Sequence, residues 1–252
     1  MILLKIRGDS LKTIISPAKN MITDKNIIKP INTLDLDENT IILHNKLKNF
    51  SPSDFSAYMN VNSEIALKTF AYYQDMNFEG MGTPAIFSYN GIQYKNMELN
   101  DFDSNDILFA SEHIFIISAL YGIINATEPI QPYRLEMGSK IPKNLYKFWD
   151  NKIYTKLFND TNTVINLASD EYSKCITSFI SEGNNFITVK FMKYSKGKYK
   201  TFATDAKISR GKMVRYIVKN KIDTVEEIKN FCENDYTFSE NFSNKNTLVF
   251  VK

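Results

Sequence analysis

One short loop combines groups capable of chemistry in a pattern that is unusual for connecting chain. Its sequence over residues 131–137 is Gln-Pro-Tyr-Arg-Leu-Glu-Met, whereas most surface loops consist of Gly, Asn, Ser and isolated charges. The guanidinium of Arg134 and the carboxylate of Glu136 alternate with Leu135 and Met137. This alternation predicts that the polar groups project into a cleft while their apolar neighbours are buried in the core.

Polar residues also follow three apolar runs that have the composition of buried strands. The runs at residues 13–15, 114–119 and 164–167 are rich in β-branched residues, which is typical of strands covered on both faces in parallel or mixed α/β sheets. If the strands are parallel neighbours, their carboxyl ends meet where ligands of open α/β sheets usually bind. The resulting pocket candidates are Lys19, Tyr121, Tyr133, Arg134, Glu136, Asn166, Asp170, Glu171, Lys207 and Arg210. For Ser169, Asp170 and Glu171 an N-cap with an acidic first turn remains an alternative interpretation.

The helix expected after Asp205 places its basic residues on two faces. At 100° per residue, Lys207 and Arg210 fall within the stripe of apolar residues on this helix. A cation in that position needs an acidic partner or a cavity, unless its long side chain extends to solvent. The acids expected opposite them are Glu136, Asp170 and Glu171. Three other cations share the outer face and suit contacts with phosphate: Lys212, Arg215 and Lys219.

Basic residues are concentrated in one segment of the chain. Residues 190–221 contain eleven Lys or Arg and a single acid, so this segment carries +10 and the rest carries −7 of a net charge of +3. A basic stripe on an otherwise acidic chain is typical of a polyanion-binding protein, although a solvated Lys-rich hairpin and helix would have the same composition. The candidates for contact with nucleic acid are Lys198, Lys212, Arg215, Lys219 and Lys221.

The elements that must position these groups follow from periodicity and capping signals. Spaced apolar residues predict helices over 34–50, 53–75, 143–158 and 170–180, with Ser53 and Asn144 as N-caps. Alternation predicts a hairpin over 186–204, and a last strand is expected at 247–251. We expect a single α/β domain over 1–252, with a mixed, largely buried sheet flanked by helices and an embellished C-terminal third at 186–252.

Composition excludes several classes of function. With two His and two Cys among 252 residues, a dedicated metal site and a disulfide framework are both improbable, and no cofactor is expected. No apolar run approaches the roughly 20 residues of a membrane span, and no signal peptide is legible, so we expect a cytoplasmic protein without a membrane partner. No Walker A loop, G-x-G-x-x-G or G-x-S-x-G motif is present.

Several longer motifs occur together and in a fixed order. They are Ile-Ser-Pro-Ala-Lys at 15–19, Gly-Ile-Gln-Tyr at 91–94, Ser-Ala-Leu-Tyr-Gly at 118–122, Pro-Tyr-Arg-Leu-Glu-Met at 132–137, Leu-Tyr-Lys-Phe-Trp at 145–149, Asn-Leu-Ala-Ser-Asp-Glu-Tyr at 166–172 and Arg-Gly-Lys-Met at 210–213. In these motifs, from about residue 12 to the C-terminus, the chain resembles the YaaA family of bacterial peroxide-resistance proteins. Residues 1–11 form an extension before the usual start of the family.

The resemblance implies a protein of the peroxide stress response, with lowered free intracellular iron as its physiology. It also implies binding of double-stranded DNA by a basic cleft and a helix-hairpin-helix-like element, in which hairpin amides hold phosphates without reading sequence. The turns at 219–223 and 120–123 are the two candidates for that hairpin. Two positions depart from the family pattern, Asn90 before Gly91 and Asp205 before Ala206.

Three hypotheses about function stay open at this point. The first is a stress protein that binds duplex DNA with little sequence specificity. The second is an enzyme acting on a nucleobase, nucleotide or damaged DNA, with Tyr121 or Tyr133 stacking a base and Glu136 or Asp170 as general acid or base. The cleft of such an enzyme would take a small nucleotide-like ligand. The third, direct binding of iron by carboxylates, is disfavoured by the scarcity of His and Cys.

Overall fold

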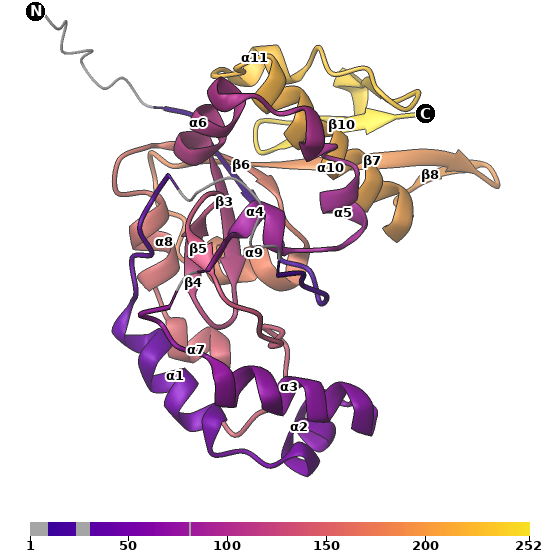
Figure 1. Cartoon of the computed structure of the whole chain (residues 1–252). Helices are drawn as coiled ribbons and strands as arrows, with labels where there is room; N and C mark the ends of the chain where they lie inside the picture. Colours follow the sequence, from indigo (N-terminus) through magenta and orange to yellow (C-terminus); the bar gives the residue numbers. More distant parts are fainter. Residues whose placement is uncertain (1–9, 24–30, 81) are drawn as a thin grey trace, which may run out of the picture.

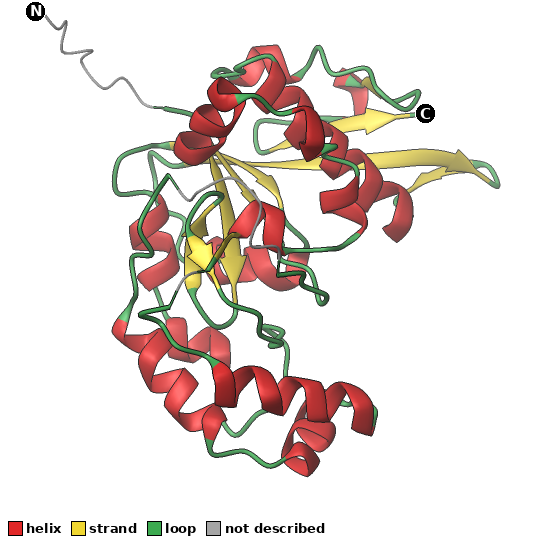
Figure 2. Ribbon diagram, viewed as in Figure 1, coloured by secondary structure: helices red, strands yellow, loops and turns green. Residues whose placement is uncertain are grey.

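A sheet of mixed direction forms the centre of the molecule (Figures 1 and 2). The structure is a computed structural model and describes residues 10–23, 31–80 and 82–252. The sheet has the strand order β4-β3-β1-β6-β7-β10-β9, and β8 pairs with β7. Its strands are β1 (Lys12–Ile15), β3 (Ile114–Ser118), β4 (Gly122–Asn125), β6 (Thr163–Leu167), β7 (Asn185–Ser195), β8 (Lys198–Lys200), β9 (Thr237–Phe238) and β10 (Thr247–Val251). A separate ladder joins β2 (Thr83–Pro84) to β5 (Pro129–Ile130).

The three strands predicted from β-branched runs are parallel neighbours. β1 lies between β3 and β6, with Ile14 in register with both Phe115 and Asn166. The chain leaves β1 for β3 on one side, and it leaves β6 for β7 on the other side. The connections after β1 and β6 therefore diverge, which makes the carboxyl ends of these two strands a topological switch point.

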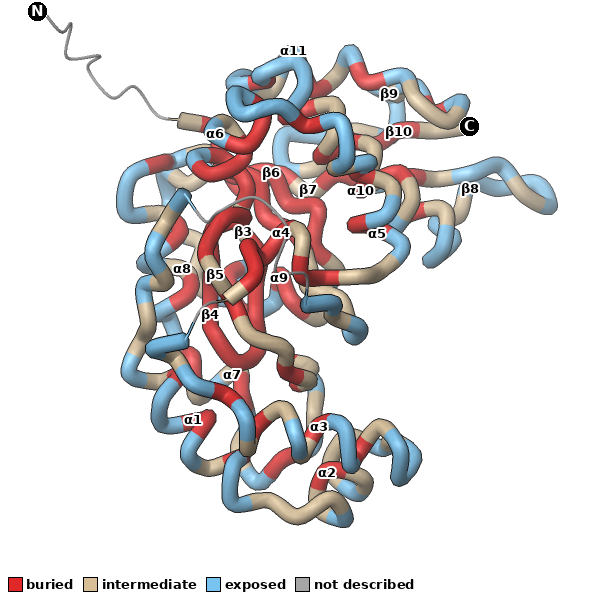
Figure 3. The backbone as a smooth tube through the Cα atoms, viewed as in Figure 1, coloured by how far each residue is buried: buried red, intermediate tan, exposed pale blue. Residues whose placement is uncertain are grey.

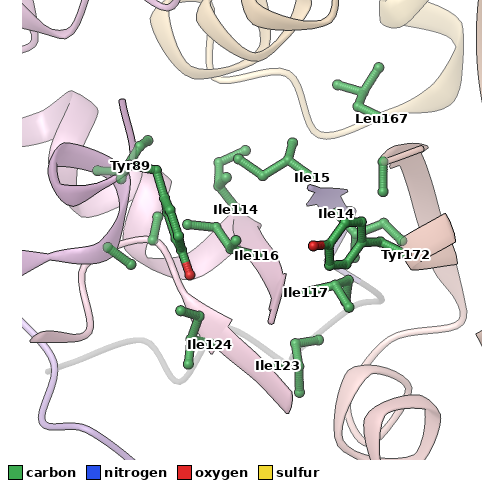
Figure 4. Packing of buried hydrophobic residues seen from close by; sticks show 14 of the residues in the cluster. Ile14, Ile15, Tyr89, Ile114, Ile116, Ile117, Ile123, Ile124, Leu167 and Tyr172 are labelled. Atoms are coloured by element: carbon green, nitrogen blue, oxygen red, sulfur yellow. The ribbon is translucent and has the colours of Figure 1, made fainter. Parts of the chain in front are cut away.

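The core confirms that the strands are covered on both faces. Every residue of β1 is buried, as are both Val164 and Ile165 of β6, and Figure 3 shows the central strands as the most continuously buried part of the chain. Figure 4 shows Ile14 and Ile15 packed among isoleucines of β3 and β4. Successive residues of one strand point to opposite faces, so burial of both requires covering layers on each side.

Helices supply those layers. The longer ones are α1 (Glu38–Lys48), α2 (Pro52–Met59), α3 (Ser63–Asp75), α6 (Ser104–His113), α9 (Asp170–Thr177) and α10 (Ala203–Lys219). The short ones are α4 (Ala85–Ser88), α5 (Ile92–Lys95), α7 (Leu145–Trp149), α8 (Lys152–Leu157) and α11 (Val225–Ile228). α10 contacts α5, α6 and β7, whereas α8 contacts α9 and β4. α1, α2, α3 and α7 gather at one end of the molecule (Figure 1).

The predicted helix bounds were too generous, and two predicted helices are broken. The helix expected over 53–75 is divided between α2 and α3, because Asn60 adopts the left-handed conformation at the end of α2. Its N-cap is Ser51, in a capping box with Asp54, rather than Ser53. The helix expected over 143–158 is divided between α7 and α8 at Asp150, which has a positive φ. The predicted N-cap Asn144 is confirmed.

One of the two turns proposed for the helix-hairpin-helix-like element is wrong. The turn at 120–123 joins β3 to β4 and so lies between strands. The turn at 219–223 does lie between helices, α10 and α11. Its amides at Asn220, Lys221 and Ile222 donate to carbonyls of α10, so they complete that helix rather than face outward. Within the described ranges, no helix has the length and apolar content that crossing a membrane requires.

Candidate functional site

A cleft lined by several charged side chains opens at the switch point of the sheet. It encloses about 290 Å³ beyond the ends of β1 and β6. At its floor Ser16, the residue after β1, contacts Ser169 near the end of β6: the Ser16 hydroxyl accepts from the Ser169 amide at 2.8 Å, and the two hydroxyls are 3.2 Å apart. Tyr94 of α5 donates its hydroxyl to the Ser16 carbonyl at 2.8 Å. These bonds fix three separate segments around one cavity.

The loop at 131–137 forms one wall of this cleft, as its alternating pattern predicted. Leu135 and Met137 are buried in the core, whereas Arg134 and Glu136 line the cavity or its rim and are partly exposed. The Glu136 carboxylate lies 2.6 Å from Lys19 Nζ and 3.5 Å from Arg134 Nη2. Glu136 is therefore paired with one cation from the β1 loop and one from its own loop.

The opposite wall is α10 packed against α5. Lys207 and Arg210 line the cleft from α10, and Gln93 lines it from α5. The two helices meet closely because Gly211 lacks a side chain: a Cβ there would lie 2.2 Å from the Gln93 carbonyl oxygen. Lys207 and Arg210, which the helical wheel placed inside the apolar stripe, both line this cleft; Lys207 is exposed and Arg210 is partly buried.

Cations exceed acids around the cavity. Its lining contains four cations, Lys19, Arg134, Lys207 and Arg210, and two carboxylates, Glu136 and Glu171. Oε1 of Glu171 accepts from the Gly138 amide at 2.8 Å. Burial lowers the pKa of Arg210, and the charge of Asp170 acts in the opposite direction. The cleft is thus a positively charged site with carboxylates on one side.

Three buried nitrogen donors of the lining have no hydrogen-bond partner within the described residues. They are Nε2 of Gln93, Nε of Arg134 and Nε of Arg210. Gln93 is only 7% exposed, and the side chain of Arg134 is 13% exposed. A buried donor without an acceptor costs about 1–3 kcal/mol, so native structures rarely leave one unpaired outside a functional site.

Three pocket candidates do not line the cleft. Asn166 is buried and accepts from the Ala168 amide, so it shapes the turn after β6. Asp170 is not part of the lining, and its charge acts on Arg210. Tyr121 is 3% exposed and packs edge-to-face on Tyr133, so its ring has no face free for a base.

Tyr133 lines the cleft but is tied into the core. Its hydroxyl bonds with those of Ser118 and Tyr89, both at 2.8 Å, and its ring is 3% exposed. Burial raises the pKa of Tyr133 to about 12. The expectation that Tyr133 stacks a ligand base is therefore not supported by its surroundings.

The cations predicted to face outward on α10 are paired with acids instead. Arg215 binds Asp101 through both terminal nitrogens, at 2.6 and 2.5 Å. Lys219 and Lys221 both bind Asp106, and Lys212 lies 3.4 Å from Glu233. A helical wheel shows which residues share a face but not what packs on it, and here that face meets carboxylates from three places: Asp101 before α6, Asp106 within α6 and Glu233 after α11.

Among the lining residues that sequence reasoning missed, four make the bonds or carry the unpaired donor that shape the cleft. Ser16, Gln93, Tyr94 and Ser169 bond across the cleft or point an unpaired donor into it. All four belong to the motifs at 15–19, 91–94 and 166–172, so those motifs were the signal that could have found them. No group of three or more His, Cys, Asp or Glu side chains suited to a metal ion occurs in the described part of the chain.

Comparison with known proteins gives a consistent result. Residues 11–242 match the family described as peroxide stress protein YaaA. The chain is 39% identical over 249 residues to a UPF0246 protein of Clostridioides difficile (strain 630), covering 94% of this chain and 98% of that protein. It is also 39% identical over 246 residues to a UPF0246 protein of Ligilactobacillus salivarius (strain UCC118), covering 96% of this chain and 100% of that protein.

Proposed function

Because the chain belongs to the YaaA family of peroxide stress proteins, we propose that it binds double-stranded DNA during peroxide stress through the basic hairpin of β7 and β8. Binding has little sequence specificity and helps to limit the oxidative damage that free iron drives. The observation that carries this proposal is the cross-strand pair Lys193 and Lys200. Like charges directly opposite each other destabilise a hairpin, and a bound polyanion offsets that repulsion.

The surroundings of this pair fit nucleic acid. Lys196 and Lys198 extend the basic surface to the tip of the hairpin, which is exposed and projects from the body (Figures 1 and 3). None of these four lysines has an ion-pair partner in the portion of the chain that the structure describes. Tyr194 is 58% exposed, and its register with Tyr199 places it on the opposite face of the hairpin from Lys193, Lys198 and Lys200. Exposed cations without ion-pair partners are typical of a surface that holds a nucleic-acid backbone.

The cations of α10 contribute less in this proposal. Arg215 and Lys219 of α10, and Lys221 just after it, already bind carboxylates, so a phosphate has to compete with Asp101 and Asp106 for them. The amides of the turn at 219–223 are also used internally. Of the predicted contacts, we therefore place Lys198 at the centre and the α10 cations at the margin.

A charge reversal on the hairpin tests this proposal. The double variant Lys193→Glu, Lys198→Glu should bind a 20-base-pair duplex more weakly whatever its sequence, with a salt slope smaller by about 0.9 for each lost phosphate contact. The matched control is Lys68→Glu, Lys147→Glu, which changes the net charge equally on α3 and α7. Equal affinity and slope in the hairpin variant and the unchanged protein would contradict the proposal, as would an equal loss in the control.

A second candidate function is favoured by the two carboxylates of the cleft. Glu136 and Glu171 both line the switch-point cavity, and paired carboxylates in one cleft can share general acid and base roles. This candidate is an enzyme acting on a nucleobase, nucleotide or damaged DNA. Glu171→Gln would then abolish protection against peroxide with fold and duplex binding intact, and full protection by that variant would exclude the candidate.

A further inference from the structure

The cleft donors that lack a partner among the described residues come from three different elements. Gln93 belongs to α5, Arg134 to the loop at 131–137, and Arg210 to α10. Each buried nitrogen belongs to a residue that lines the same cavity of about 290 Å³. Since buried N–H groups are paired in almost all native structures, three in one cavity identify the place of a missing acceptor.

The charges around the cavity are divided between its two sides. Glu136 is neutralised by Lys19 and Arg134, whereas Lys207 and Arg210 have no carboxylate within 4 Å among the residues that the structure places. The excess positive charge therefore lies on the α10 side. A neutral ligand would leave it uncompensated, and an anion would not.

The directions of the donors distinguish between kinds of anion. A planar carboxylate is matched by one guanidinium fork. Donors that approach from three separate elements match a tetrahedral group, whose oxygens point in several directions and accept several bonds each. The size of the cavity, at the lower end of the range of ligand pockets, limits the rest of the molecule to a small one.

We propose that the cleft binds a small phosphate monoester, with its phosphate on Arg210, Arg134 and Gln93. The remainder of the ligand carries hydroxyl or amino groups that donate to Glu171, whose Oε1 already accepts from the Gly138 amide. This inference rests on the second candidate function, in which the cleft takes a nucleotide-like ligand, and it names the group that the cleft recognises. It is independent of duplex binding by the hairpin.

Titration calorimetry with defined compounds tests the proposal. The panel is inorganic phosphate, ribose 5-phosphate, the four ribonucleoside 5′-monophosphates, their unphosphorylated nucleosides, and succinate. At least one monophosphate should bind, at least about tenfold more tightly than its nucleoside and than succinate. Absence of binding by every phosphate compound at millimolar concentration overturns the proposal, and tighter binding of succinate or of the nucleosides overturns the assignment to phosphate.

Variants locate the binding in the cleft. Arg210→Met and Gln93→Glu should each weaken the monophosphate roughly 10- to 100-fold, since one removes a charged donor and the other places a carboxylate beside the phosphate. Lys68→Met, on α3, is the control and should bind as the unchanged protein does. If Gln93→Glu keeps its thermal transition and also its affinity, the phosphate lies elsewhere and the proposal fails.

The two proposals fail separately. If Arg210→Met loses monophosphate binding and keeps its affinity for duplex DNA, the proposed phosphate site in the cleft is supported, whether or not the hairpin binds DNA. Unchanged duplex affinity in Lys193→Glu, Lys198→Glu, together with intact monophosphate binding, refutes only the DNA proposal.

Discussion

Replacing Gly211 by Ala should move one wall of the cleft. A Cβ at this position would meet the Gln93 carbonyl oxygen at 2.2 Å, where ordinary contacts begin at 3.4 Å, so α5 has to withdraw by about 1.2 Å or α10 has to shift. In an exposed helix the same change would stabilise by about 1 kcal/mol through helix propensity. Overpacking against backbone costs about 3 kcal/mol, at the upper end of the usual range. The net loss is therefore about 2 kcal/mol.

Thermal and urea unfolding measure this loss. For a chain of this size, about 2 kcal/mol corresponds to a melting temperature lower by about 4–8 °C. The matched control is Ser209→Ala on the same helix, since Ser209 is fully buried and its hydroxyl has no partner in the described structure. It gains helix propensity without a clash and should be neutral or slightly stabilising. If Gly211→Ala stabilises the protein as Ser209→Ala does, α5 is not held against Gly211 and the reasoning is refuted.

Two further predictions concern pH. Burial raises the pKa of Asp106, but hydrogen bonds from Lys219 and Lys221 outweigh this effect and lower the pKa to about 2. The ionised carboxylate therefore stabilises the fold above pH 4, and this stabilisation is lost as the pH falls towards 2. Urea unfolding should show the free energy of unfolding fall by about 1–2 kcal/mol between pH 4 and 2, and Asp106→Asn should lack this contribution. Burial raises the pKa of Glu128 to about 7, so the stability contributed by its neutral carboxyl is present below pH 4.5 and lost as the pH rises through 7. The free energy of unfolding of Glu128→Gln should exceed that of the unchanged protein by about 1–3 kcal/mol at pH 8 and equal it at pH 4. Equal stability of the two proteins at pH 8 would contradict the assignment.

The sheet was largely predictable because its information is local. Unbroken β-branched runs predicted buried, parallel strands, and β1, β3 and β6 are parallel neighbours. Helix ends were predicted less well: the break at Asn60 depends on a single left-handed residue, and an apolar period continues across such a residue unchanged. The predicted bounds were likewise too long, by six residues for α1 and by three for α9.

The candidate site was predictable in part. The alternation of the loop at 131–137 placed Arg134 and Glu136 in the cleft, and the helical wheel placed Arg210 there. The wheel could not show that Asp101 and Asp106 pack on the other basic face, since they lie more than 100 residues away. Gln93 was not among the predicted pocket residues. Its role depends on a side-chain amide without a hydrogen-bond partner in the described structure, and neither composition nor the periodicity of apolar residues reveals such a group.

The sequence by itself determined the family, the class of the fold and the chemical types available, because these follow from motifs, periodicity and composition. Tertiary structure alone decided which cations are free. The same +10 segment contributes paired cations on α10, an exposed basic hairpin at β7 and β8, and Arg210 with an unsatisfied nitrogen in the cleft. The physical reason is that a charge acts according to its burial and its nearest opposite charge, and both are set by packing between distant segments.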